Sequence, residues 1–101
     1  DATKAAALPG VATVLTRETL DGMNPYFGSA YKDQTIVALD KVRYDGDPVA
    51  AVAADTLEIA DAALKLIEVD YEELPGVYDP LEAVKPGTVA LHDELRNPAL
   101  L

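Results

Sequence analysis

The residues with the most evident chemical potential are a histidine and two acids near the carboxyl end of the chain. His92 is the only histidine, and Asp93 and Glu94 follow it directly. An imidazole beside carboxylates is a candidate general base or metal ligand. A general base also needs a nucleophile or a cleft, and a metal site needs several ligands, but the sequence supplies neither. We therefore interpret His92 as a non-catalytic residue.

Three other groups of polar residues resemble sites but lack a necessary component. Residues 45–47, Asp-Gly-Asp, begin like a calcium loop, yet the alternating oxygen ligands and the distant closing glutamate are absent. Glu72 and Glu73 are adjacent on a predicted strand, so their carboxylates point to opposite faces and cannot act together. Ser29 lies in a predicted loop without a suitable histidine nearby, and the chain has no glycine-rich phosphate loop.

Arg43 and Tyr44 leave two interpretations open, because they stand beside a predicted turn. They either contact a partner or pack against that turn, and neither interpretation makes them catalytic. The sequence therefore predicts no catalytic, no cofactor-binding and no metal-ligating residue on this chain. Residue chemistry alone indicates a small α+β domain, and function has to be inferred from other features.

The elements that surround these residues are organised by the stretch Val42–Pro75. Turn-forming residues fill positions 45–48, and Pro48 fixes its own φ for entry into an extended run. The apolar run 49–54 has the length of a strand and the composition of one that is covered on both faces. Asp55 is a suitable N-cap for a helix that we predict over about 56–67.

This predicted helix is amphipathic, since a rotation of 100° per residue gathers its apolar side chains on one half. The apolar half comprises Leu57, Ile59, Ala60, Ala63, Leu64, Leu66 and Ile67. The polar half comprises Glu58, Asp61, Lys65 and Glu68. We predict that the apolar half faces a core. From Ile67 to Glu72 the period changes to two, which predicts a strand with one buried face.

The remainder of the chain is predicted to form short elements separated by turns. These are a helix over 3–8, a strand over 11–15, a turn over 16–20 capped by Thr16, strands over 35–39 and 42–44, and a helical turn over 79–84. The loop 23–32 contains three aromatic residues, which either pin the loop or meet a partner. Residues 86–101 are predicted to form an exit segment.

Composition excludes several classes of protein. The chain of 101 residues is long enough for one domain with a modest core. Its 18 acidic and 8 basic residues give a formal charge of -10, which disfavours nucleic acid and anionic lipid as partners. The absence of cysteine excludes disulfides and thiolate-ligated metals on this chain. Because no apolar run reaches the ~20 residues of a membrane span, we expect a soluble, cytoplasmic protein without membrane contact.

The order of residues between Val42 and Val84 gives information about the protein family that these physical features do not. This stretch strongly resembles the amino-terminal hammerhead domain of the large, molybdenum-cofactor-binding subunit of the xanthine dehydrogenase and aldehyde oxidase family, whose members include carbon monoxide dehydrogenase and 4-hydroxybenzoyl-CoA reductase. The segments 7–16, ALPGVATVLT, and 33–42, DQTIVALDKV, are also similar to the family and occur in the same order. The resemblance covers most of the chain.

The resemblance implies an α/β hammerhead fold for residues 1–101, with a mixed sheet, one main amphipathic helix over about 56–67 and short accessory helices. It implies a parent enzyme that is a molybdopterin-dependent oxidoreductase, with its iron–sulfur clusters on other domains or subunits. None of the family's cofactor-binding or catalytic residues maps onto this chain. We therefore expect a non-catalytic structural domain that supports the cofactor domains and contacts other subunits.

Two further expectations concern partners. The family has a strand before the stretch that corresponds to residues 1–4, and this chain starts without it. A sheet edge left open in this way would recruit another chain, so we expect the isolated domain to self-associate. The alternative hypothesis for function is a free-standing α+β module that binds a protein or a ligand and shares the fold.

Overall fold

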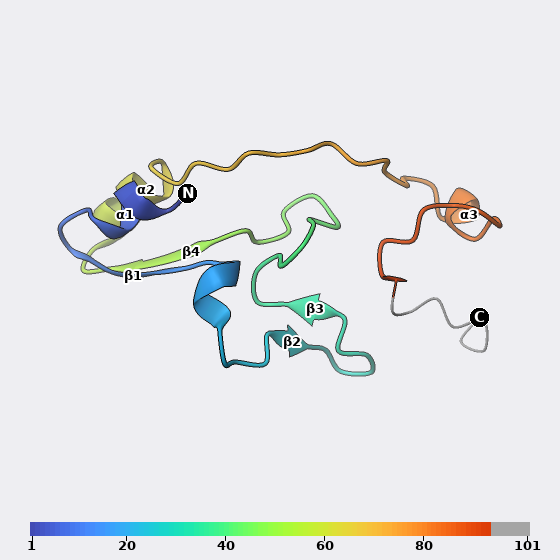
Figure 1. The fold of residues 1–101 in the computed structure, drawn as a ribbon, viewed down its shortest axis with the longest axis horizontal. Helices are drawn as coiled ribbons and strands as arrows, with labels where there is room; N and C mark the ends of the chain where they lie inside the picture. The colour runs from blue at the N-terminus through green and yellow to red at the C-terminus, as the bar shows by residue number, and fades with distance from the viewer. Residues whose placement is uncertain (94–101) are drawn as a thin grey trace. The chain divides into compact units, whose positions relative to one another are not determined.

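The computed structural model describes residues 1–93, which contain eight short helices and strands (Figure 1). In chain order these are α1 (Thr3–Ala6), β1 (Val11–Leu15), the 3-10 helix η1 (Arg17–Leu20), β2 (Tyr26–Phe27), β3 (Gln34–Thr35), β4 (Ala51–Ala54), α2 (Leu57–Leu64) and α3 (Pro80–Ala83). Two compact units are distinguished, the first over Asp1–Asp70 and the second beginning at Tyr71. Glu94 and the later part of the predicted exit segment lie outside the described residues.

The core of the first unit is formed by two helices packed on a pair of strands (Figure 1). Strands β1 and β4 are antiparallel, with Val14 opposite Val52, and the register is interrupted between Val11 and Thr13. Ala5 of α1 and Ala63 of α2 are fully buried beside Val14 of β1. The two alanines have small side chains, which lets the helices approach the strands and each other closely. Partly buried residues surround this centre: Ala2, Leu8, Val11, Val52, Leu66 and Ile67.

Local signals in the sequence located several elements correctly. Strand β1 has the predicted bounds, and α1 begins at the predicted residue but ends two residues early. At η1, Thr16 is the N-cap as expected, and it forms a capping box with Thr19, whose Oγ1 accepts from the backbone N–H of Thr16 at 2.8 Å. At α3, Oδ1 of Asp79 accepts from the backbone N–H of Leu81 at 2.8 Å. Each of these contacts lies within a few residues along the chain, which is why sequence patterns predict it.

The main helix begins one residue later than predicted, and its cap is a different residue. Thr56, and not Asp55, is the N-cap of α2, because its Oγ1 accepts from the backbone N–H of Ile59 at 3.3 Å. The backbone N–H of Asp55 instead donates to the carbonyl of Gly10 at 2.8 Å, which continues the contact between β4 and the start of β1. The helix then ends at Leu64, three residues short of the predicted end.

We expect Thr56→Ala to lower the free energy of unfolding by about 1 kcal/mol, since it removes the acceptor for the first turn of α2. The neighbouring change Asp55→Ala is the control, because no side-chain cap bond of α2 depends on Asp55. Denaturant melts of both variants measure the difference. A larger loss for Asp55→Ala than for Thr56→Ala would contradict this assignment of the cap.

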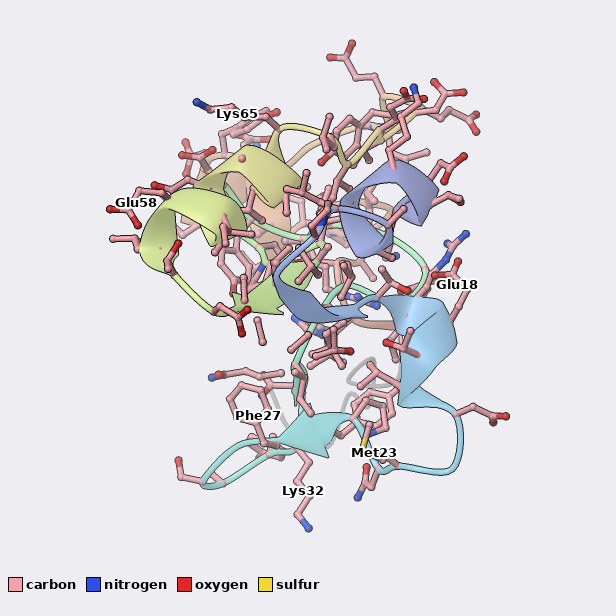
Figure 2. All side chains as sticks on the ribbon, turned by 90° about the vertical axis from the view of Figure 1, so that its left-hand side faces the viewer. Glu18, Met23, Phe27, Lys32, Glu58 and Lys65 are labelled. Carbon is pink, nitrogen blue, oxygen red and sulfur yellow. The ribbon has the colours of Figure 1, made fainter. Side chains whose placement is uncertain are left out.

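The predicted apolar face of the helix is only partly buried. Ala63 is buried and Ile59 is half-buried, but Leu57 is 74% exposed and Leu64 is 47% exposed. The reason is geometric, since α1 and two short strands cover a narrower area than the apolar half of α2 offers. The predicted polar half was correct, and Figure 2 shows Glu58 and Lys65 on the outer side of the helix.

The predicted strands were longer than those that form. In residues 1–93 the strands make two antiparallel pairs, β1 with β4 and β2 with β3, in place of the expected mixed sheet. Strand β4 alternates between exposed and half-buried residues, so it is not covered on both faces. Of the predicted strand 35–39 only Thr35 lies in a strand, β3, and strands over 42–44 and 67–72 do not form. A strand needs a hydrogen-bonded neighbour along its length, and in residues 1–93 the segment 67–72 makes backbone hydrogen bonds to a distant segment only through Glu68, which pairs with Asp1.

Candidate functional site

The polar residues singled out by sequence are found in both units of the described residues 1–93. His92 is half-buried in the second unit, and Ser29 is exposed in the first. Glu72 and Glu73 are both exposed, and they do not lie on a strand. Across residues 1–93, no group of three or more His, Cys, Asp or Glu side chains could hold a metal ion.

The turn at residues 45–47 is structural. The backbone N–H of Asp47 donates to the carbonyl of Tyr44 at 3.2 Å, and Oδ2 of Asp47 accepts from the backbone N–H of Arg43 at 2.9 Å. The Arg43 guanidinium contacts Oδ1 of Asp40 at 3.2 Å, and its side chain is only 15% exposed. For Arg43, packing beside the turn is therefore the correct alternative. Tyr44 is 63% exposed and stays available to a partner.

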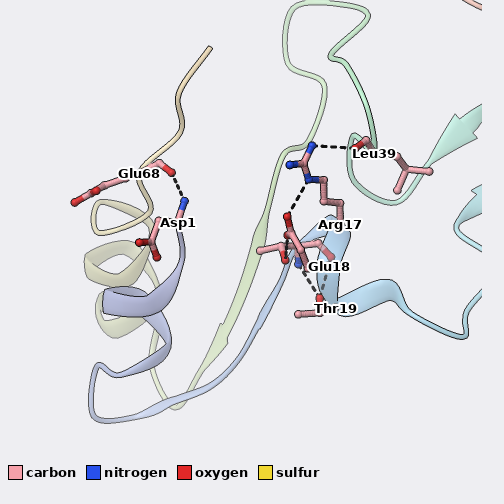
Figure 3. Close-up of polar contacts among 7 residues, drawn as sticks. Asp1, Arg17, Glu18, Thr19, Leu39 and Glu68 are labelled. Carbon is pink, nitrogen blue, oxygen red and sulfur yellow. Dashed lines mark hydrogen bonds and ion pairs between the residues drawn. The ribbon is translucent and has the colours of Figure 1, made fainter. Parts of the chain in front are cut away.

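Two carboxylates in the first unit have lowered pKa values. Burial opposes the ionisation of Asp40, but the backbone N–H of Lys41 and the charge of Arg43 outweigh it and hold the pKa of Asp40 below its usual value. At Glu18, hydrogen bonds from Arg17 and then from Thr16 lower the pKa to about 2. Figure 3 shows that Arg17 also donates to the carbonyl of Leu39, at 3.3 Å, so this ion pair ties η1 to a distant loop. These groups stabilise turns, and neither faces an enclosed site.

A pterin cofactor would need an enclosed site with several directed polar groups. Among residues 1–93, no polar or charged residue is buried, and the fully or nearly buried side chains are all aliphatic. The buried residues are Ala5, Val14, Leu20, Val37 and Ala63. This donor set does not fit a molybdopterin, so we derive no chemical step through such a group on this chain.

One surface feature of the first unit is a group of large apolar side chains around the β2–β3 pair, which we call the aromatic hairpin. It consists of Met23, Tyr26, Phe27, Tyr31 and Ile36, and each of these residues is between 43% and 53% exposed. The antiparallel pairs Tyr26 with Thr35 and Phe27 with Gln34 hold it together. Figure 2 shows Met23 and Phe27 beside this pair of strands. Of the two interpretations of the loop aromatics, their exposure favours contact with a partner.

A second feature was missed by sequence reasoning. The amino group of Asp1 donates to the carbonyl of Glu68 (Figure 3). The N–H of Glu68 donates to the carbonyl of Asp1 at 2.9 Å. The signal that could have indicated this contact is the alternating pattern that begins at Ile67, because an alternating segment requires a neighbouring strand.

The helices described in residues 1–93 include none with the length and apolar character of a membrane span.

Comparison with known proteins shows which family has this small α+β architecture. The family described as "Aldehyde oxidase and xanthine dehydrogenase, a/b hammerhead domain" matches residues 1–75. The chain belongs to this family, as its hammerhead domain. The resemblance found in the sequence is thereby confirmed, together with the hammerhead fold.

Individual relatives agree with this assignment. The chain is 45% identical over 91 residues to a probable xanthine dehydrogenase protein of Bacillus subtilis, a match that covers 90% of the chain and 12% of that protein. It is 38% identical over 94 residues to the nicotinate dehydrogenase large molybdopterin subunit of Eubacterium barkeri, covering 93% and 22%. The solved aldehyde oxidoreductase of Desulfovibrio gigas matches with a TM-score of 0.71 and 29% identity, covering 92% and 11%. The chain thus spans a small part of each relative.

Proposed function

We propose that this chain is a non-catalytic structural domain of a cytoplasmic, molybdopterin-dependent oxidoreductase, a hydroxylase or dehydrogenase of the xanthine dehydrogenase and aldehyde oxidase type. In this proposal residues 1–101 form one hammerhead domain that braces the cofactor domains and contacts neighbouring subunits. The molybdopterin and the iron–sulfur clusters are bound by other domains or subunits. The names of the relatives support the class of parent enzyme, and the donor set described above supports the absence of a cofactor site here.

The exposure of the aromatic hairpin is the observation that supports a structural role for this chain. Burial of the exposed parts of five large apolar side chains would stabilise an interface far more than surface ion pairs do. Aromatic residues and methionine are also the types enriched at the centres of protein interfaces. An isolated pair of two-residue strands has little stability of its own, so a covering partner would also stabilise the β2–β3 pairing.

The alternative, a free-standing module, has less support. A free-standing module is expected to have relatives of about its own length. The relatives described above are much longer, since the chain covers 12% of the Bacillus subtilis protein and 22% of the Eubacterium barkeri protein. The comparisons therefore favour a domain of a larger enzyme.

A domain exchange tests the proposal directly. In the Bacillus subtilis relative, this chain replaces the matching region of 91 residues. We expect the chimera to assemble and to retain molybdenum as the parent protein does. In the chimera, Phe27→Asp should lower the association constant for assembly about tenfold or more, since an interface hot spot contributes roughly 2 kcal/mol. Size-exclusion chromatography and metal analysis measure both quantities.

The matched control is Gln34→Asp, which adds the same charge opposite Phe27 in the same pair of strands. We expect it to assemble nearly as well as the unmodified chimera, because Gln34 contributes no apolar surface. Equal assembly of the two variants would show that the aromatic hairpin is not part of the interface. Stoichiometric molybdenum retained by this chain alone would contradict its non-catalytic role.

A further inference from the structure

Helix α3 is the only helix or strand of the second unit within the described residues 71–93 (Figure 1). It lies beyond residue 75, where the match to the hammerhead family ends. The match to the Bacillus subtilis protein leaves out only a tenth of the chain, so it includes α3 wherever it begins. The region shared with that larger protein therefore extends past the hammerhead match and contains α3.

Local polar contacts order α3. Oδ1 of Asp79 accepts from the backbone N–H of Leu81 at 2.8 Å, and the carbonyl of Asp79 accepts from the N–H of Ala83 at 3.0 Å. Oγ1 of Thr88 donates to the carbonyl of Glu82 at 2.8 Å. A helix of four residues has little stability of its own. The cap and the threonine therefore supply the contacts that hold this turn.

The apolar side chains at α3 are exposed. Leu81 is 73% exposed and Val84 is 71% exposed. They are three residues apart, so they are neighbours on one face of the turn. Tyr78, directly before the cap, is 96% exposed. Polar contacts thus order the turn while its apolar side chains stay uncovered, so binding a partner through these side chains would require little further ordering.

The charge of this segment defines the kind of partner that fits it. Residues 71–85 contain four acidic residues and one basic residue, which gives a net charge of -3. The basic residue, Lys85, already forms an ion pair with Glu82. A surface that covers the apolar side chains should therefore carry cationic groups at its edge, because opposite charges favour association. A second copy fits less well, since it would bring two acidic segments together.

We propose that α3 is a docking anchor, whose side chains Tyr78, Leu81 and Val84 occupy an apolar groove with a rim of Lys or Arg side chains in the remainder of the parent enzyme. The inference rests on the proposed function, which supplies the larger enzyme. Helical segments that place residues i and i+3 in an apolar groove are a recurrent mode of recognition. The aromatic hairpin of the first unit is then a separate contact with the same enzyme.

Amide hydrogen exchange in the free chain and in the chimeric enzyme described above tests this inference. The amides of Ala83 and Lys85 are hydrogen-bonded within the turn, to the carbonyls of Asp79 and Glu82. We expect both amides to exchange about tenfold or more slowly in the assembled chimera than in the free chain, because a covered turn opens less often. The amides of β1 and β4 report in both proteins that the fold is kept.

A substitution on each side of α3 tests the apolar anchor. In the chimera, Leu81→Ser should return the exchange of the Lys85 amide to near its rate in the free chain. The matched control is Ala83→Ser, which places the same side chain about 200° around the helix from Leu81. Ala83 is also exposed, so the control does not disturb a buried position. We expect the control to keep most of the protection.

A further substitution tests the cationic rim. Asp79→Asn keeps a side-chain oxygen that can cap α3 but removes the negative charge. In the chimera it should speed exchange at Ala83 and Lys85 severalfold at low salt, and less at high salt, because salt screens the lost attraction. The control is Asp61→Asn on the exposed side of α2, which removes the same charge from the first unit and should leave α3 unchanged.

Several results would overturn the inference. Equal exchange at Ala83 and Lys85 in the free chain and in an assembled chimera that retains molybdenum would leave the proposed function standing and remove the docking role of α3. Equal loss of protection in Leu81→Ser and Ala83→Ser would show that the apolar face is not the anchor. An Asp79→Asn chimera with unchanged exchange would exclude the cationic rim.

The occupant and the proposed function are tested by two other outcomes. Protection of α3 that rises with the concentration of the free chain would make a second copy the occupant and overturn the inference. A chimera that fails to assemble without any substitution would contradict the proposed function, and also this inference, because the groove belongs to the same enzyme. Failure of the inference alone is therefore distinguishable, since it gives an assembled enzyme in which α3 stays exposed.

Discussion

Ala63→Asp is expected to unfold the first unit of the chain. Ala63 is 0% exposed and lies at the centre of the core, beside Ala5 and Val14. An aspartate there would be a buried charge without a partner, at a cost of about 3 to 5 kcal/mol. Domains of this size have a total stability of only about 5 to 15 kcal/mol, and this core contains few buried side chains. So small a core places this domain at the low end of that range, where the substitution removes most of the available stability.

The adjacent residue provides a matched control for this prediction. Ala62 is on the same helix but exposed, so Ala62→Asp introduces the same side chain with the same helix propensity. We expect Ala62→Asp to change the free energy of unfolding by less than about 1 kcal/mol. Circular dichroism and denaturant melts of both variants measure the difference. Similar melts would show that Ala63 is not the point where α1, α2 and β1 meet.

The position of Ala63 illustrates what the sequence could and could not predict. The helical period correctly placed Glu58 and Lys65 on the outer side, and it included Ala63 in the apolar half. It could not distinguish Ala63, which is buried, from Leu57, which is 74% exposed. Periodicity reports the direction of a side chain from the helix axis, but burial also requires a neighbour on that side. The neighbours α1 and β1 are too small to cover the whole face.

The same need for a neighbour explains why only some of the predicted strands form. The composition of β1 and of the segment after Ile67 is equally typical of a strand. In the described chain β1 pairs with β4 along its length, whereas the segment after Ile67 bonds to a distant segment only through Glu68. Turns and caps were easier to predict, because the groups that form them lie within a few residues of each other. The cap of α2 was wrong by one residue, since the backbone of Asp55 bonds to Gly10, a contact distant in sequence.

The candidate site was predicted only in part. Three aromatic residues between positions 23 and 32 indicated either a pinned loop or a contact with a partner, and sequence alone could not choose between them. Their exposure favours contact with a partner, because Tyr26, Phe27 and Tyr31 are each about half exposed. The contact between Asp1 and Glu68 joins the two ends of the first unit. The alternating pattern from Ile67 indicates that a neighbour is needed, but no local pattern identifies Asp1 as that neighbour.

Gly28→Ala is expected to abolish the pairing of β2 with β3. Gly28 follows directly after Phe27 and has a φ of +150°, in a region that residues with a side chain rarely adopt. A Cβ atom added there would lie 1.7 Å from the carbonyl oxygen of Tyr31, well inside van der Waals contact. Because this neighbour is backbone, the clash can be relieved only by moving the chain. The combined clash and strain should destabilise the hairpin by roughly 2 to 5 kcal/mol.

Two-residue strands cannot withstand a loss of this size, so the amides at the Tyr26–Thr35 and Phe27–Gln34 pairs should lose their protection from exchange in the Gly28→Ala variant. Gly22→Ala is the control, because Gly22 also has a positive φ, +79°, but no atom within 4 Å of the added Cβ. It should cost only about 1 to 2 kcal/mol through strain.

In the chimeric enzyme, Gly28→Ala should impair assembly as Phe27→Asp does, since both changes disrupt the proposed interface at the aromatic hairpin. Normal assembly of the Gly28→Ala chimera, with the β2–β3 pairing lost, would show that the interface does not depend on the shape of this hairpin.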